Sequence, residues 1–182
     1  MDFSKDIRSN RIAMVSFCLL CQSFQAEGIV RNYPAVVSPV IQVLLDRNVN
    51  ILQMPCPESL YGGLEKGLGR EPKSYKKYDT QQFRQHCRTF AEQTLLTARA
   101  LVCHGFEIAA VLGVEFSPSC AVNYQYEGRT VHRKGIYFEL LEQLFEAEGI
   151  TTRFIGVNRR GTQPAVRELH ELLEPQLSLR LG

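Results

Sequence analysis

The chain has 182 residues, of which 45% are hydrophobic, 22% charged and 9% aromatic, a composition typical of a folded globular domain. Its 21 basic and 19 acidic side chains leave a formal net charge of only +2, which predicts no general affinity for nucleic acid or for an acidic membrane surface. No apolar run approaches the roughly 18 residues that a membrane-spanning helix needs, so we predict one domain, residues 1–182, that does not span a membrane.

The first apolar run, Ile12–Leu20, follows basic residues, a pattern shared by secretory signal peptides and by the first strands of domains. Asp2 and Asp6 are acidic where a signal peptide would be basic, and the bulky Leu20 stands where a small residue precedes cleavage. The same features argue against a lipoprotein signal that would end at Cys21. We therefore expect a strand here and a cytoplasmic protein, whose cysteines are candidates for metal binding or catalysis before disulfides.

Short β-branched runs alternate with longer amphipathic runs along the chain, as in β-α-β units wound into a parallel sheet. This pattern predicts an α/β fold, a single Rossmann-like domain with a mostly parallel sheet and helices on both faces. The predicted strands are Ile12–Phe17, Val49–Gln53, Ile108–Val114 and Thr152–Val157. Two segments, Cys21–Ser38 and Met54–Asp79, show no regular pattern and are predicted to be loops.

The first two helices are predicted from apolar spacing and from their end residues. The first runs over Pro39–Arg47 with Ser38 as its N-cap. Its predicted buried face consists of Val40, Ile41, Leu44 and Leu45. The second is much longer, Thr80–His104, and ends at Gly105. Its predicted apolar stripe consists of Phe83, Cys87, Phe90, Thr94, Ala98 and Leu101.

Two further helices are predicted in the C-terminal third of the chain. The third runs over Lys134–Glu148 and is stopped by Gly149. It is expected to bury Ile136, Leu140, Leu141, Leu144 and Phe145. The fourth follows Pro164 and is expected to bury Val166, Leu169, Leu172 and Leu173.

The predicted loop Met54–Asp79 is long for a strand-to-helix connection, and such loops in compact domains are often functional. Between residues 62 and 78 it carries a net charge of +3. Its basic residues are Lys66, Arg70, Lys73, Lys76 and Lys77. Two interpretations are open, a solvated surface or a lid that receives an anionic or polar substrate. Arg159 and Arg160, just after the last predicted strand, would add cations at the same edge of the sheet.

Three of the six cysteines follow three different predicted strands. Cys18 comes directly after the first strand, Cys56 three residues after the second, and Cys120 six residues after the third. Because parallel strands end at one edge of a sheet, we expect these three thiols to gather there. Cys87 on the inner stripe of the second helix and Cys103 in its last turn are instead predicted to pack as small hydrophobic residues.

Cys18 and Cys21 also form a Cys-x-x-Cys pair, which alone is a weak signal. No second pair follows to complete a structural zinc site, and the pair does not open a predicted helix as a redox pair does. Three thiolates from three loops suit an open metal centre better. On a four-iron cluster, three protein ligands would leave one iron for substrate.

Glu58 and Ser117 lie close in sequence to Cys56 and Cys120, respectively. Both side chains are expected to face the same crevice, where a carboxylate can act as a general acid or base. The alternative role is structural, because serine and glutamate often cap backbone N–H groups in turns.

Three motifs surround the three cysteines: Ser16-Phe17-Cys18-Leu19-Leu20, Pro55-Cys56-Pro57-Glu58 with Gly62-Gly63-Leu64, and Ser117-Pro118-Ser119-Cys120. In this order and at these separations they resemble the signature blocks of the thiouracil desulfidase family, over roughly residues 12–157. The resemblance implies a Rossmann-like domain that binds a 4Fe-4S cluster through Cys18, Cys56 and Cys120, with Glu58 and Ser117 as the catalytic pair. The chain departs from the family at Cys21 and at Ala121, where glycine is common.

These observations predict an iron-sulfur-dependent desulfidase that removes sulfur hydrolytically, without net redox change, and releases hydrosulfide. The expected substrate is a thiolated pyrimidine base, its nucleotide or a related thio-compound, and a thiolated nucleic acid stays open. Glu58 would take a proton from water, while Ser117 would position the ring or relay a proton. The alternative is a non-catalytic metal-binding or redox-sensing module, with zinc or a labile cluster on the three cysteines. A plain nucleotide-binding domain is disfavoured because no Gly-x-Gly-x-x-Gly follows the first strand.

Overall fold

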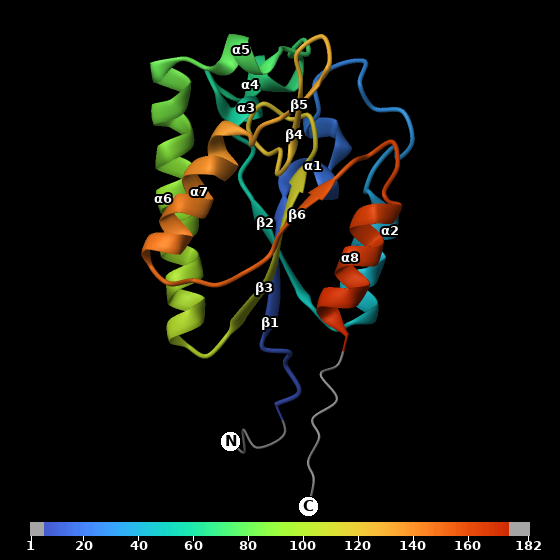
Figure 1. The fold of residues 1–182 in the computed structure, drawn as a ribbon, viewed down its shortest axis with the longest axis vertical. Coiled ribbons are helices and arrows are strands. Elements are labelled where there is room, and N and C mark those ends of the chain that lie inside the picture. The colour runs from blue at the N-terminus through green and yellow to red at the C-terminus, as the bar shows by residue number, and fades with distance from the viewer. Residues whose placement is uncertain (1–5, 175–182) are drawn as a thin grey trace, which may run out of the picture.

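The structure is a computed structural model that describes residues 6–174 (Figure 1). Its centre is a four-stranded sheet in the order β2-β1-β3-β6 in which neighbouring strands are parallel. The strands are β1 (Arg11–Ser16), β2 (Asn50–Met54), β3 (Glu107–Val114) and β6 (Phe154–Val157). The predicted α/β fold and all four predicted strands are confirmed, with ends displaced by at most two residues. The predicted domain also includes residues 1–5, among them Asp2, and residues 175–182, all of which lie outside the described residues.

Helices cover both faces of the sheet, as expected. The helices α6 (Gln81–Cys103) and α7 (Ile136–Ala147) pack against each other on one face. The helices α2 (Ser38–Asp46) and α8 (Gln163–Leu173) pack against each other on the opposite face (Figure 1). No helix within residues 6–174 is both long enough and apolar enough to cross a membrane.

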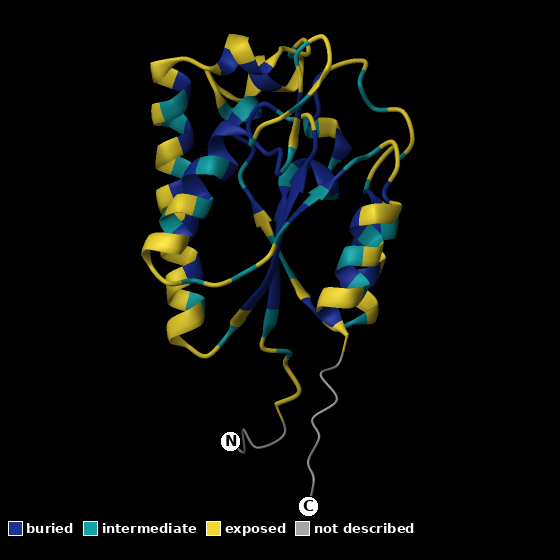
Figure 2. Ribbon diagram, in the orientation of Figure 1, coloured by how far each residue is buried: buried dark blue, intermediate teal, exposed yellow. Residues whose placement is uncertain are grey.

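The sheet separates two hydrophobic cores because alternate residues of a strand face opposite sides. Met14 of β1 packs with Phe83 and Tyr137 under α6 and α7. Its neighbours Ala13 and Val15 join the core formed with α2 and α8. Figure 2 shows the result, with the strands buried between helices whose outer faces are exposed.

The glycines that end α6 and α7 act as predicted, whereas Thr80, expected inside the second helix, is its N-cap. The Thr80 hydroxyl caps α6 by accepting a hydrogen bond from the Phe83 N–H at 3.2 Å. Gly105 and Gly149 follow the two helices with positive φ angles of 81° and 67°, a conformation that favours glycine. The predicted stripe of α6 faces the core, with Phe90 and Leu101 only half-buried.

Some predicted details of the helices are wrong. Ser38 is the first residue of α2 and makes no side-chain cap, because the helix begins one residue earlier than expected. The buried face of α2 includes Val43 in place of Leu45, which is 55% exposed. In α8, Leu172 is 38% exposed, since the buried stripe runs through Ala165, Leu169 and Leu173. Cys103 is exposed because α6 extends beyond the end of its partner α7 (Figure 1).

The two predicted loops, and the segments that follow β1 and β3, contain short elements that the sequence pattern did not indicate. Residues 54–79 form three short helices, α3 (Pro57–Leu60), α4 (Leu64–Leu68) and α5 (Tyr75–Tyr78). The helix α1 (Phe17–Leu20) directly follows β1, and a 3-10 turn η1 (Gln22–Phe24) comes next. A hairpin of β4 (Tyr124–Tyr126) and β5 (Thr130–His132) was also not predicted. Elements this short contain too few residues for a hydrophobic period. All of them lie at the carboxyl edge of the sheet (Figure 1).

Candidate active site

The strand order explains why three cysteines gather at one edge. Because β2, β1 and β3 are neighbours in the sheet, the segments that follow them are neighbours as well. Cys56 follows β2 at the start of α3, Cys18 lies in α1 directly after β1, and Cys120 lies in the loop after β3. All three are free thiols, and each is less than 9% exposed.

The three thiols are close enough to influence one another. Burial, together with the charge of Cys56, raises the pKa of the Cys18 thiol to about 12. Burial also raises the pKa of Cys120 well above its usual value, and Cys18 and Cys56 add to this effect. The pKa of Cys56 is raised by burial and by the charge of Glu58. In water-poor surroundings the neutral thiol is the favoured form, so a bound cation is needed to hold three thiolates here.

The three thiols are not placed as the ligands of a single metal ion. Among the described residues, no three His, Cys, Asp or Glu side chains form a group that could hold one metal ion. A tetrahedral zinc site brings its thiolate sulfurs to within about 2.3 Å of the ion.

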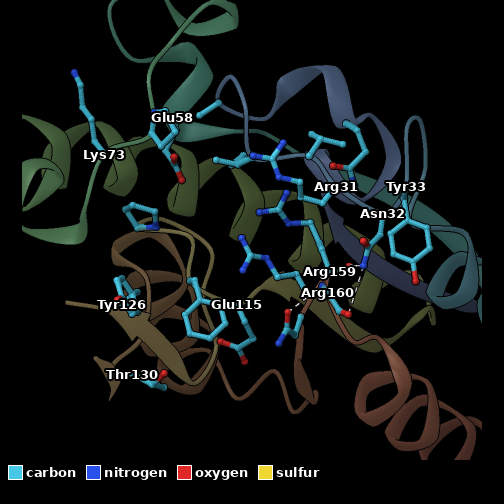
Figure 3. Close-up of a pocket in the computed structure, with 18 residues that line it drawn as sticks. Arg31, Asn32, Tyr33, Glu58, Lys73, Glu115, Tyr126, Thr130, Arg159 and Arg160 are labelled. Atoms are coloured by element: carbon cyan, nitrogen blue, oxygen red, sulfur yellow. Dashed lines mark hydrogen bonds between the residues drawn. The ribbon is translucent and has the colours of Figure 1, made fainter. Parts of the chain in front are cut away.

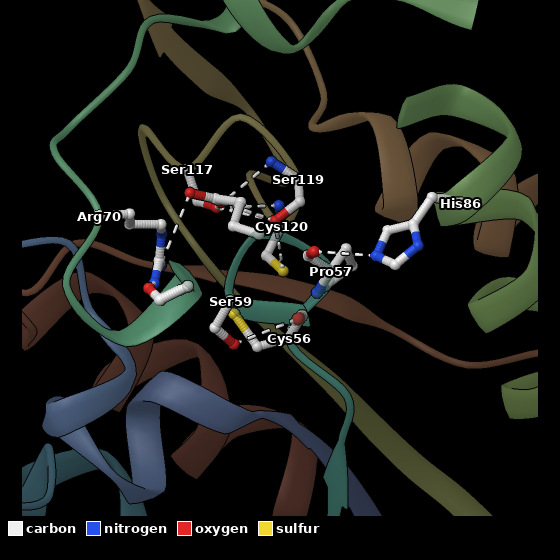
Figure 4. A network of polar contacts seen from close by, with 10 residues as sticks. Cys56, Pro57, Ser59, Arg70, His86, Ser117, Ser119 and Cys120 are labelled. Carbon is white, nitrogen blue, oxygen red and sulfur yellow. Dashed lines mark hydrogen bonds and ion pairs between the residues drawn. The ribbon is translucent and has the colours of Figure 1, made fainter. Parts of the chain in front are cut away.

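A carboxylate and two hydroxyl groups form a polar network beside the thiols (Figure 4). The hydroxyls of Ser117 and Ser119 each donate a hydrogen bond to Oε1 of Glu58, both at 2.7 Å. Ser119 Oγ also lies 3.3 Å from the Cys120 sulfur. The network links Glu58, near the end of β2, to the loop that carries Cys120. Glu58 and Ser117 therefore face the same space, as their positions in the sequence predicted.

Arg70 approaches the same carboxylate from the other side. Its Nη2 lies 3.8 Å from Oε2 of Glu58, and both side chains are about nine-tenths buried. Its Nη1 donates to the Gly67 carbonyl at 2.8 Å, while its Nε is buried without a partner among the described residues. Glu58 thus receives hydroxyl protons at one oxygen and faces a cation at the other.

The turn that carries Ser117 and Cys120 is closely packed. Ser117 Oγ accepts hydrogen bonds from the backbone N–H groups of Ser119 at 3.3 Å and Cys120 at 3.1 Å. Ser117 therefore has both roles: its hydroxyl caps backbone N–H groups of the turn and also donates to Glu58. Gly113 and Gly135 pack against this turn, and a Cβ atom on either would lie 2.3 Å from backbone atoms of residues 119–120.

A cavity of about 680 Å3 is lined in part by Glu58 (Figure 3). Its walls come from the segment between β1 and α2, from the turn after β3, from the β4–β5 hairpin and from the turn after β6. The cations that line it are Arg31, Lys73, Arg159 and Arg160. Arg159 is close enough to the site for its charge to lower the pKa of Cys18, while burial lowers its own pKa. The expected basic edge is therefore present.

Some residues of the charged segment 62–78 contact the site, and others form a solvated surface. Arg70 reaches Glu58, and Lys73 lines the cavity. Lys66, Lys76 and Lys77 are exposed, as on a solvated surface. The segment consequently contributes two cations to the site rather than five.

The remaining cysteines have other surroundings. Cys87 is buried in the core under α6, as predicted, and burial raises its pKa. Cys21 is half-buried, and its N–H donates to the Phe17 carbonyl at 2.9 Å. Like the other cysteines, it is absent from the described lining of the cavity. Cys103 is exposed at the far end of α6, so its predicted packing role is wrong.

Sequence reasoning missed several residues of the site. Ser119 belongs to the motif that ends at Cys120, but the sequence indicated no role for it, although its hydroxyl contacts both Glu58 and Cys120. Arg70 was only one charge in a basic segment. Four buried polar atoms without partners in the described chain also lie in segments at this edge, in Ser16, Gln22, Gln25 and Arg70. The spacing of Ser119 from Cys120 could have indicated its role, whereas no local signal indicated that of Arg70.

Known proteins resemble the chain in fold and in sequence. No model of a known protein family matches the chain. A solved structure of the 4Fe-4S-dependent thiouracil desulfidase TudS aligns with 90% of this chain and 97% of its own, with a TM-score of 0.52 and 24% sequence identity. This likeness shows that the chain has the fold of that enzyme.

A second comparison identifies a relative in sequence. The uncharacterized protein MJ0003 of Methanocaldococcus jannaschii is 30% identical over 116 residues, which cover 64% of this chain and 70% of the relative. At this identity and coverage, the chain belongs to the same protein family as MJ0003.

Proposed function

We propose that this protein binds a 4Fe-4S cluster through Cys18, Cys56 and Cys120 and removes sulfur from a thiolated pyrimidine with release of hydrosulfide. The observation that carries the proposal is the placement of three buried thiols near the Glu58–Ser117 hydrogen bond, next to the cavity that Glu58 lines. The shared fold with a 4Fe-4S-dependent thiouracil desulfidase supports it. The resemblance of the three motifs to that family agrees with it.

The donor set fits this cofactor. Iron-sulfur clusters are held by cysteine thiolates, and three such side chains come here from three separate segments. The cations Arg70 and Arg159 lie near enough to lower the pKa of Cys18, which favours an anionic thiolate-bound group.

The chain's own acid-base residues complete the proposed chemistry. When bound, a cluster with one iron free of protein ligands would supply a soft Lewis acid for the substrate's sulfur. Glu58 is proposed to accept the proton of the attacking water. Ser117, whose hydroxyl donates to Glu58 at 2.7 Å, would pass a proton between the carboxylate and a substrate atom. Ser119 would hold the same carboxylate oxygen in place.

The cavity favours a polar, anionic form of the substrate. Its volume of about 680 Å3 lies in the range of small-molecule sites, and a pyrimidine alone would fill only part of it. Arg31, Arg159 and Arg160 line the part that remains. Guanidinium groups suit phosphate recognition, so we propose that a thiolated nucleotide is preferred to the free base.

The first test identifies the metal. Protein purified anaerobically and reconstituted with iron and sulfide should be brown and contain about four irons and four sulfides per chain. Stoichiometric zinc without iron after reconstitution would instead favour the metal-binding or sensing module.

The second test identifies the substrate. Anaerobic holoprotein should be offered thiouracil, thiouridine, thiouridine monophosphate and thiolated RNA. Loss of thiocarbonyl absorbance and the yield of sulfide are then measured for each. The expected order places the monophosphate first. A preference for the free base would contradict the role given to the arginines, and sulfide release from none of the four would contradict desulfidase activity.

A further inference from the structure

Phe116 has an unusual backbone conformation next to the proposed catalytic serine. Its φ angle is +67°, in the region that favours glycine. Among the described non-glycine residues, only Asn48 shares a positive φ, and asparagine adopts this conformation far more readily than an aromatic residue. A bulky side chain is therefore kept where glycine would be less strained.

Hydrogen bonds on both sides fix this conformation. The Glu115 N–H donates to the Val157 carbonyl at 3.0 Å, and the Ser117 N–H donates to the Val114 carbonyl at 3.1 Å. The Phe116 N–H itself donates to the Tyr124 carbonyl at 2.9 Å. The turn is therefore tied to the sheet and to the β4–β5 hairpin, and this surrounding structure enforces the strain.

The ring of Phe116 contributes little to the packing of the protein. It is 40% exposed and belongs to neither hydrophobic core. Within residues 6–174 it pairs with no other aromatic ring. Instead it lines the cavity, together with Glu58 and Tyr126, one residue before Ser117.

We infer that Phe116 is a specificity-determining residue whose ring stacks on the planar heteroaromatic ring of the substrate. An exposed aromatic face beside the reacting groups offers such a ring a stacking surface. Fixing the ring beside Ser117 would orient the substrate toward the Glu58–Ser117 pair. This inference rests on the proposed function, because it assigns the planar part of that substrate to one wall of the cavity.

The test uses binding rather than turnover. The probes are uracil, which is planar and contains no sulfur, and 5,6-dihydrouracil, which has the same polar groups on a puckered ring. Their dissociation constants for the reconstituted holoprotein are measured by calorimetry. The unmodified protein should prefer uracil. Phe116→Asn, which suits a positive φ, should weaken uracil binding by about 5- to 100-fold. Binding of dihydrouracil should change much less.

Further variants separate stacking from folding and from strain. Phe116→Tyr should keep the preference for uracil, whereas Phe116→Leu should lose most of it while keeping an apolar side chain. Asn48→Gly changes the other residue with positive φ, outside the cavity, and should leave both affinities unchanged. Thermal unfolding of each variant shows whether it is folded.

The possible outcomes distinguish this inference from the proposed function. Equal affinities of the unmodified protein for the two probes, or binding of neither, would overturn the stacking role. An unchanged preference in both Phe116→Asn and Phe116→Leu would overturn it as well. A preference that depends on Phe116, in a holoprotein that releases no sulfide, would support stacking and contradict desulfidase activity.

Discussion

The carboxyl edge of the sheet and the α6–α7 layer both contain buried polar groups, but the two regions differ in whether these groups have hydrogen-bond partners. Between α6 and α7, the Thr94 and Tyr137 hydroxyls form a 2.7 Å hydrogen bond, so each has a partner. At the carboxyl edge, by contrast, Ser16, Gln22, Gln25 and Arg70 have buried polar atoms without a partner in the described chain. Unpaired buried groups are rare in folded proteins, and each calls for a functional or structural explanation.

The cysteines show the same contrast. Cys87 lies among the apolar side chains of α6 and α7, including Phe83 and Ala91. Cys56 and Cys120 are similarly buried, yet Ser119 contacts the Cys120 sulfur and Glu58 lies beside both segments. Burial alone therefore does not distinguish a structural thiol from a candidate ligand. The position of the thiol relative to the strand ends does so.

The largest expected effect tests this contrast between cysteines. Cys18→Ala, Cys56→Ala and Cys120→Ala should each abolish binding of the iron-sulfur cluster, because each would remove one of its three protein ligands. Cys87→Ala and the exposed Cys103→Ala should retain full iron content. Iron and acid-labile sulfide are measured after anaerobic reconstitution. Loss of iron in Cys87→Ala with retention in Cys18→Ala would reverse the assignment.

The next effect separates ligands from catalysts within the edge itself. Glu58→Gln and Ser117→Ala should keep the cluster spectrum but lose about a hundredfold to ten-thousandfold of the sulfide-release rate. The reason is that these residues are proposed to move protons, not to bind iron. Sulfide release is followed together with the visible spectrum. Full activity of either variant would show that the residue has a structural role and no catalytic one.

A third prediction compares a buried ion pair with an exposed one. Arg70→Met should reduce the free energy of unfolding by about 3 kcal/mol, because it leaves Glu58 buried without its cation. The control is Arg153→Met, which breaks a pair with Glu168 at 3.0 Å between side chains that are 65% and 38% exposed. This change should cost less than about 1 kcal/mol. Chemical denaturation measures both, and equal costs would show that the Arg70 contact contributes little.

The smallest expected effect concerns the backbone of the site. Gly135→Ala places a Cβ atom 2.3 Å from the backbone of Ser119, so the turn before Cys120 must move. Overpacking of this kind costs about 1–3 kcal/mol, and we also expect a lower iron content. Gly161→Ala, which meets no atom within 4 Å, is the matched control. Unchanged stability and iron content in Gly135→Ala would show that the turn tolerates displacement.

Local sequence patterns determined most of the sheet and its covering helices. The apolar runs of β1 and β3 and the stripe of α6 each repeat a period over enough residues to be recognised. Because strands of a parallel sheet end at one edge, the same patterns also predicted that Cys18, Cys56 and Cys120 would gather. The expectation that Glu58 and Ser117 share a crevice followed from their proximity to two of these cysteines.

Only the tertiary structure decided what these residues contact. The strand order β2-β1-β3-β6 is set by pairing between distant segments, and no residue in β2 alone indicates that β1 is its neighbour. Arg70 contacts Glu58, and the Phe116 N–H donates to the Tyr124 carbonyl. Both contacts depend on how the loops fold over the sheet. The exposure of Cys103 likewise depends on where the neighbouring helix α7 ends, and that of Leu45 on which face of α2 meets α8 and the sheet. Periodicity reports which face of an element is apolar, whereas packing between distant segments decides what that face meets.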